Sequence, residues 1–201
     1  MWGLNQREIH KLSETFYRRY PVVEGDRGYF APRHASAILV LKKLLGGLKG
    51  KKILELGFRD VPFLLELKKR GALVAGIDSD PFARFGYELR NKLNLWPVEV
   101  MGMGKIFKEQ KFDAAVAYNL FDLYDLSHTQ ETLKSMFKSV RAQLEEGGIF
   151  LIGGTAPEEG PPNLPRLKAE DWYKSLGFKI VKPTTKTASP HAVSIIILRS
   201  V

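Results

Sequence analysis

Short apolar runs alternate along the chain with longer segments in which apolar residues recur every three or four positions. The runs have the length of buried strands and cover residues 53–55, 73–78, 98–101, 112–118, 149–152, 178–181 and 192–198. The periodic segments predict helices over 5–18, 36–48, 62–70, 81–93, 130–144 and 171–176, with an irregular segment at 22–32. Strands that alternate with helices indicate a largely parallel sheet covered on both faces, which is an α/β fold.

Residues 53–78 have the size of one strand–helix–strand crossover. A glycine turn at Gly57 follows the first strand, Pro62 suits the opening turn of a helix, and Gly71 returns the chain to the second strand. A parallel pair places the Gly57 turn at the carboxyl edge of the sheet, where open α/β folds bind ligands. Asp78 closes the second strand and is placed to accept hydrogen bonds from ribose hydroxyls, so the segment predicts a nucleoside site.

The dinucleotide fingerprint requires glycines at three positions of such a turn. Gly57 is present, but Arg59 and Pro62 occupy the other two positions. Side chains there keep the backbone away from a pyrophosphate, so the sequence disfavours an NAD-dependent reductase.

The stretch resembles motif I of the class I S-adenosylmethionine-dependent methyltransferases, an acid-x-Gly-x-Gly-x-Gly loop after the first strand. Glu55 and Gly57 match the acid and the first glycine, Arg59 and Val61 replace the second and third glycines, and Asp78 matches the family's ribose-binding acid. Farther along, Gly147-Gly148 resembles the diglycine before strand five, and Leu176-Gly177-Phe178 resembles the family's Leu-Gly-Phe before strand six.

The resemblance covers about residues 50–201 and implies a Rossmann-like three-layer sandwich. Its sheet would have seven mostly parallel strands with an antiparallel last strand. Residues 1–50 are then expected to form a helical extension packed on the core domain at 51–201.

The resemblance also implies roles for individual residues around a bound S-adenosylmethionine. Gly57 and Phe58 would approach its methionine part, and Glu55 would order water or the amino group. Asp78, with Ser79 beside it, would bind the ribose.

Two further positions follow from the same resemblance. Met103, after the third strand, would lie near the adenine, where many relatives place an acid. Asn119, at the carboxyl end of strand four, would lie near the transferred methyl group. Its continuation, Asn119-Leu120-Phe121, argues against transferases that act on amino groups of DNA bases, which carry Asn-Pro-Pro-Tyr or Asp-Pro-Pro-Tyr there.

Arg59 leaves three readings open, because a cation in a loop for a sulfonium is electrostatically unfavourable. It binds the cofactor's carboxylate, it points away or pairs with an acid such as Asp60 or Glu55, or it marks an altered pocket that takes phosphate or no ligand. Methyl transfer is a direct displacement in which positioning supplies much of the catalysis, and a base is required only for a protonated acceptor. His34 and His128 are the candidate bases.

Composition limits the alternatives. The chain has 201 residues, 44% of them apolar, and no cysteine, which excludes disulfides and thiolate zinc sites. No apolar run has the length of a membrane span, and the first residues lack the apolar core of a signal peptide, so we expect a cytoplasmic protein without membrane contact. Asp122, Asp125 and His128 are interpreted as a solvated loop, and no metal site is predicted.

The net charge of +9 is unevenly distributed, with basic ends around an acidic stretch at 111–160. The surplus indicates either a solvated lysine-rich surface or a phosphate-bearing partner. Two hypotheses follow. The first is a methyltransferase that acts on a small molecule or RNA, and the second is a catalytically inactive, methyltransferase-like binding protein with an RNA or protein partner.

Overall fold

The structure, a computed structural model, describes residues 5–19, 27–58, 61–79, 93–118, 120, 130–155, 170–184 and 193–201. The helices of these residues are α1 (Gln6–Arg19), α2 (Arg27–Leu44), α3 (Pro62–Lys69), η2 (Val100–Gly102), α5 (Met103–Phe107), α7 (Gln130–Gln143) and α8 (Glu170–Ser175). The strands are β1 (Lys52–Leu56), β2 (Leu73–Ile77), β3 (Leu95–Trp96), β4 (Phe112–Tyr118), β5 (Leu144–Thr155), β6 (Phe178–Thr184) and β7 (Val193–Ser200). No helix in these ranges is both long enough and apolar enough to span a bilayer.

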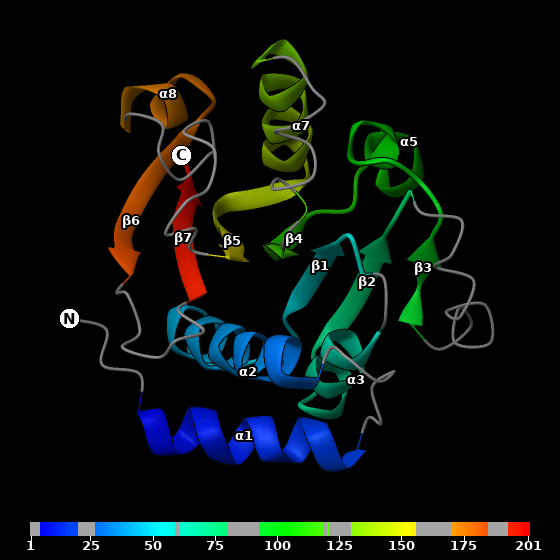
Figure 1. Cartoon of the computed structure of the whole chain (residues 1–201). Coiled ribbons are helices and arrows are strands. Elements are labelled where there is room, and N and C mark those ends of the chain that lie inside the picture. The colour runs from blue at the N-terminus through cyan, green and yellow to red at the C-terminus, as the bar shows by residue number, and fades with distance from the viewer. Residues whose placement is uncertain are drawn as a thin grey trace.

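The strands form one seven-stranded sheet in the order β3-β2-β1-β4-β5-β7-β6 (Figure 1). Strands β1 to β5 pair in parallel, and β7 runs antiparallel to both of its neighbours, β5 and β6. This arrangement confirms the predicted α/β fold with a mostly parallel sheet and an antiparallel last strand. The strand order reverses between β1 and β4, which lie side by side although β2 and β3 intervene in sequence.

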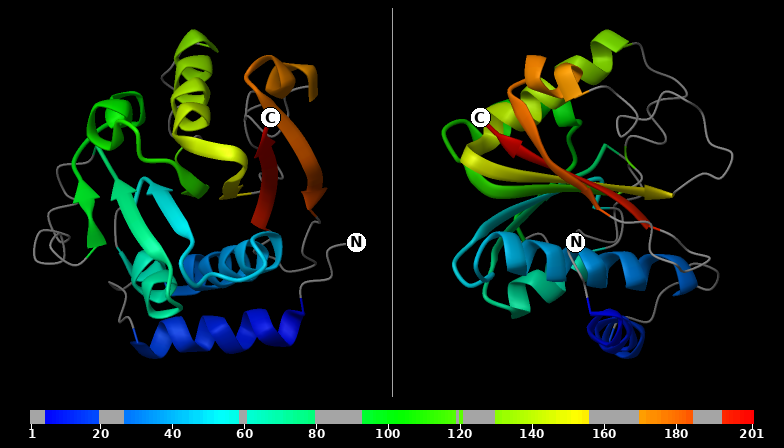
Figure 2. Two further views of the ribbon diagram at one scale, coloured as in Figure 1. Left: turned by 180° about the vertical axis from the view of Figure 1, so that it is seen from behind. Right: turned by 90° about the vertical axis from the view of Figure 1, so that its left-hand side faces the viewer.

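Helices cover both faces of the sheet, with α2 and α3 on one side and α5 and α7 on the other (Figure 2). Helix α2 presents Ile38 and Leu41, and α7 presents Phe137 and Val140, all of them fully buried. Because β4 lies at the centre between these two layers, five of its seven residues are buried and nearly all are apolar. Helix α1 packs on the outside of α2, away from the sheet (Figure 1).

Helix α2 begins earlier than the sequence predicted. The expected irregular segment at 22–32 is wrong for residues 27–32, because α2 starts at Arg27 and includes Pro32. Pro32 is the sixth residue of the helix and has no N–H to donate, but its fixed φ suits helical backbone, and the helix continues past it. The helix ends at Leu44 rather than at 48, just before Gly46 and Gly47.

The predicted strand at 98–101 and the loop at 102–104 are also wrong. The strand lies earlier, at Leu95 and Trp96, because Pro97 cannot donate a ladder hydrogen bond and ends the pairing. Residues 100–107 are helical and bury Val100, Met103 and Phe107 on one side. The helix predicted at 81–93 lies outside the described residues except for Leu93.

Tyr173 on α8 supplies a prediction about stability. Its side chain is fully buried, and its hydroxyl has no hydrogen-bond partner among the described residues; burial raises the pKa of Tyr173 above its ordinary value. A buried hydroxyl without a partner costs about 1–3 kcal/mol. Tyr173→Phe is therefore expected to raise Tm by about 2–4 °C, for a gain of about 1 kcal/mol, in calorimetry. A lower Tm would show that the hydroxyl is hydrogen-bonded in solution.

Candidate cofactor site

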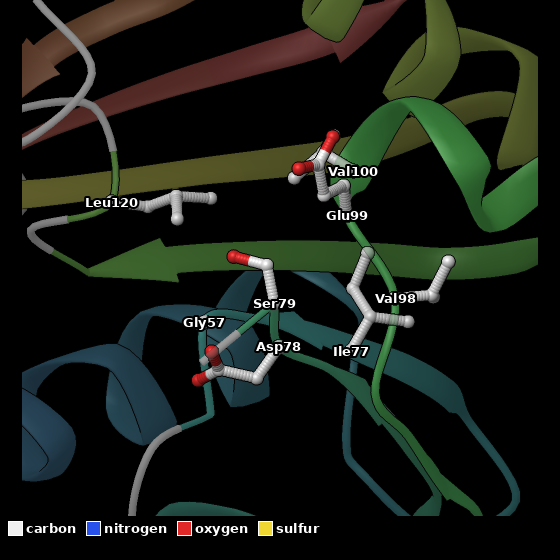
Figure 3. A pocket seen from close by; sticks show the side chains of 8 residues that line it. All are labelled: Gly57, Ile77, Asp78, Ser79, Val98, Glu99, Val100 and Leu120. Atoms are coloured by element: carbon white, nitrogen blue, oxygen red, sulfur yellow. The ribbon is translucent and has the colours of Figure 1, made fainter. Parts of the chain in front are cut away.

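A pocket opens at the carboxyl edge of the sheet, between the ends of β1 and β2 and the segment that follows β3. It encloses about 180 Å³ of space open to solvent. Its lining residues come from four parts of the chain and are shown in Figure 3: Gly57, Ile77, Asp78, Ser79, Val98, Glu99, Val100 and Leu120. The sequence predicted a ligand site at this edge, and the pocket lies there.

Gly57 makes the turn at the end of β1. Its φ of +73° is a left-handed conformation that favours glycine, and its N–H donates to the carbonyl oxygen of Ile77 at 2.8 Å. A Cβ at this position would lie only 3.3 Å from Cδ1 of Leu120, so the Leu120 side chain lies against the turn. The turn therefore keeps backbone, rather than a side chain, on this wall of the pocket.

Asp78 follows β2 directly and is 9% exposed. Its backbone N–H donates to the carbonyl oxygen of Trp96 at 3.1 Å, which fixes the residue against β3. In Figure 3 the carboxylate lies close to Gly57, and the exposed Ser79 lies above it. An ionised carboxylate accepts hydrogen bonds and donates none, so this wall suits a pair of hydroxyl groups such as those of a ribose.

The opposite wall consists of Val98, Glu99 and Val100. Glu99 has an extended backbone at the start of η2 and an exposed side chain, and the two valines beside it make the wall partly apolar. This acid is not predicted from the sequence. A strand is expected through residue 101, and the end of that strand would put the adenine contact at Met103. The signal that could have revealed it is Pro97. A strand that ends at Trp96-Pro97 is followed by Glu99 at the position where relatives place the acid.

Phe58 and Met103 do not line this pocket. Phe58 is 4% exposed and packs with Leu64, Leu93 and Leu95 beneath the turn. Met103 is fully buried in the core on the α7 side of the sheet. The pocket beside Asp78 is therefore not filled by either side chain. Of the other predicted site residues, Arg59, Asn119 and His128 lie outside the described residues.

Glu55 lies within the sheet rather than in the pocket wall. It pairs with Gly76 of β2 and Val116 of β4, and its side chain is 4% exposed. It is two residues before Gly57, at the fourth position of β1. A role toward the cofactor's amino group therefore stays a prediction.

His34 lies in an aromatic cluster where α2 meets the carboxyl ends of the strands. Its ring is 5% exposed and contacts the rings of Phe16, Phe63 and Tyr118, with centroids 5.3–5.8 Å apart. The Tyr118 ring lies over Gly153 of β5, where a Cβ would approach it to 2.1 Å, so the glycine is required for this packing. In this arrangement His34 acts as a packing residue.

The chain is similar to known proteins in its structure. No protein-family model matches the sequence, and no curated protein matches it either. Among solved structures, the chain is similar to magnesium protoporphyrin IX methyltransferase from Synechocystis PCC 6803 with bound S-adenosylmethionine, at a TM-score of 0.66 and 14% identity over 97% of this chain and 94% of the other.

Two further structures are comparable. A candidate RNA methyltransferase from Pyrococcus horikoshii matches with a TM-score of 0.64 and 15% identity over 96% of each chain. The 1,6-didemethyltoxoflavin N1-methyltransferase of Burkholderia thailandensis, with its substrate and S-adenosylhomocysteine bound, matches with a TM-score of 0.63 and 15% identity over 100% of this chain and 92% of the other. The chain therefore has the Rossmann-like fold of the class I S-adenosylmethionine-dependent methyltransferases.

Proposed function

We propose that this protein is an S-adenosylmethionine-dependent methyltransferase that acts on a small molecule or RNA. The observation that carries the proposal is that Gly57 and Asp78 line one pocket at the edge where α/β folds bind ligands. The similar structures that contain S-adenosylmethionine or S-adenosylhomocysteine support the choice of cofactor.

The pocket residues have the hydrogen-bonding and apolar groups that would recognise an adenosine. Asp78 would accept hydrogen bonds from the ribose hydroxyls, and Gly57 would allow the sugar to approach the backbone. Val98 and Val100 would contact the base, and Glu99 would accept a hydrogen bond from its exocyclic amine. Glu55 and Arg59 are proposed for the methionine part, and Ser79 would lie beside the ribose; Phe58 would support the turn from its apolar cluster.

The chemistry that the bound cofactor supplies is an electrophilic methyl group. The chain's own contribution would be to hold an acceptor in line with that group and to exclude water, which is a positioning effect. Asn119, after β4, is the proposed residue nearest to the acceptor. Since His34 is buried among aromatic rings, a base for a protonated acceptor would more readily come from His128 or from the acceptor itself.

Titration calorimetry with S-adenosylhomocysteine tests the proposal directly. We expect saturable binding with a micromolar Kd and a matching thermal shift. Absence of both heat and thermal shift at millimolar ligand would refute cofactor binding and with it the enzyme.

A catalytically inactive binding protein is the second candidate, with an RNA or protein partner. The replacement of two motif glycines by Arg59 and Val61 favours it. Transfer of labelled methyl groups from S-adenosylmethionine to pooled small-molecule or RNA acceptors distinguishes the two. Binding without any transfer would support the inactive protein.

Glu99 gives a specific prediction about base recognition. Glu99→Ala is expected to weaken S-adenosylhomocysteine binding about tenfold, because it removes one hydrogen bond to a charged group worth about 1.5 kcal/mol. The inosine analogue of the ligand carries an oxygen instead of the amine, so the native protein should discriminate against it, and the variant should discriminate less. Glu109→Gln, an exposed acid after α5, is the control and should change neither affinity. Equal discrimination in all three proteins would exclude this role for Glu99.

A further inference from the structure

A dense group of lysines lies at the amino edge of the sheet, opposite the pocket. Residues 42–52 and 68–73 contain eight cations and no Asp or Glu. Six of the cations are exposed and are called the amino-edge lysine cluster from here on: Lys42, Lys43, Lys49, Lys52, Lys68 and Lys69.

The two segments are held side by side by backbone hydrogen bonds. The N–H of Gly50 donates to the carbonyl oxygen of Gly71 at 2.8 Å, and the N–H of Leu73 donates to that of Lys51 at 2.8 Å. The turn before β1 and the turn before β2 therefore form one surface. The lysines at the ends of α2 and α3 continue it on both sides.

Among the described residues, two acids pair with cations of this surface. Asp113 pairs with Nζ of Lys51 at 3.1 Å and accepts from the N–H of Lys52. Glu66, 2% exposed, pairs with Arg70 and with Arg19 of α1. Two carboxylates stand against eight cations in residues 42–52 and 68–73, so the described residues give this surface an excess of positive charge.

Helix dipoles explain only part of the cluster. Lys42 and Lys43 lie in the last turn of α2, and Lys68 and Lys69 lie in the last turn of α3, where cations stabilise a helix. Lys49 and Lys52 lie on no helix, and they bring their charges close to both helix ends. Concentrating like charges in this way costs free energy unless an anionic partner offsets it.

We propose that the amino-edge lysine cluster binds the phosphate backbone of a double-stranded nucleic acid. Residues 42–52 and 68–73 contain no aromatic residue on which unpaired bases could stack, which favours a duplex over a single strand. A membrane surface is disfavoured because interfacial binding requires a buried apolar face, and Leu73 is the large apolar side chain that the described surface exposes there, at 58%.

This surface is separate from the cofactor pocket. The five residues of β1 separate the two edges by roughly 17 Å at about 3.3 Å per residue. Duplex binding should therefore be independent of cofactor binding, and Asp78→Asn should bind duplex as the native protein does.

Fluorescence anisotropy with labelled 20-base-pair duplexes of RNA and of DNA tests the proposal with the full-length protein. Six phosphate contacts predict a slope of log K against log salt of about −5, and binding at 50 mM salt with a Kd in the micromolar range. The variant Lys49→Gln, Lys52→Gln, Lys68→Gln, Lys69→Gln should have a slope closer to −2 and at least about 100-fold weaker binding. Binding to both duplexes indicates backbone recognition in general, and binding to RNA alone indicates selection of the A-form helix.

The control neutralises the same number of charges elsewhere, with Lys134→Gln, Lys138→Gln, Lys174→Gln and Lys179→Gln on α7, α8 and β6. It should bind duplex within about twofold of the native protein, and thermal melting should show all variants folded. The proposal is overturned if the control loses as much affinity as the cluster variant. It is equally overturned if the native protein binds anionic phosphatidylserine vesicles but neither duplex, or if it binds no probe at 50 mM salt.

Discussion

Replacement of Asp78 by asparagine is expected to weaken the binding of S-adenosylhomocysteine about 100-fold. The carboxylate can accept from both ribose hydroxyls, and each hydrogen bond to a charged group contributes about 1.5–3 kcal/mol. Asparagine keeps one acceptor oxygen but places an NH₂ donor where the second acceptor stood. A loss of about 3 kcal/mol in calorimetry corresponds to roughly two orders of magnitude in Kd.

Asp113→Asn is the matched control for this experiment. Asp113 lies on β4 at the opposite edge of the same sheet and pairs with Lys51, so the same chemical change occurs far from the pocket. Its variant should bind the ligand as the native protein does. If Asp78→Asn retained native affinity, the ribose would not lie beside Asp78, and the site proposed here would be wrong even if the protein bound the ligand.

The parts of the fold that were predictable from the sequence are those with strong local patterns. The run at 112–118 is recognisable as a strand by its continuous apolar residues, and the helix at 130–143 by the spacing of its apolar residues. The Gly57 turn is marked by its glycine. Asp78 could be placed because parallel strands joined by a helix bring their carboxyl ends to one edge.

The parts that were not predictable depend on contacts between distant segments. Strand β3 consists of two residues whose pairing with Gly76 and Ile77 defines it, and so short a strand has no period to detect. Its position determines that Glu99, rather than Met103, faces the pocket. In the sequence, Met103 lies between two glycines, which is typical of a loop. Its side chain packs in the core because residues 103–107 form a helix against α7.

One buried carboxylate on α3 pairs with cations of α3 and of α1, and the loss of these cations has the largest expected effect on stability. Glu66 of α3 is 2% exposed; its Oε1 lies 2.8 Å from Nη2 of Arg70, and its Oε2 lies 3.2 Å from Nη1 of Arg19 at the end of α1. The double variant Arg19→Ala, Arg70→Ala leaves this charge buried. We expect a loss of about 3 kcal/mol in the free energy of unfolding and a Tm lower by roughly 6–12 °C.

The cost should come from the buried charge and not from the lost attraction, and a third substitution separates the two. Both arginines are partly exposed, at 44% and 33%, so water can solvate them in the native state. Glu66→Met added to the double variant removes the charge but keeps the side-chain length, and it should recover most of the lost Tm. Helix α1 should stay docked throughout, because Ile9, Leu12 and Phe16 are buried against α2 and each contributes about 1.5–3 kcal/mol. Unchanged helicity in circular dichroism with a lowered Tm is therefore the expected result for the double variant. A triple variant no more stable than the double would mean that the ion pairs themselves hold the two helices together.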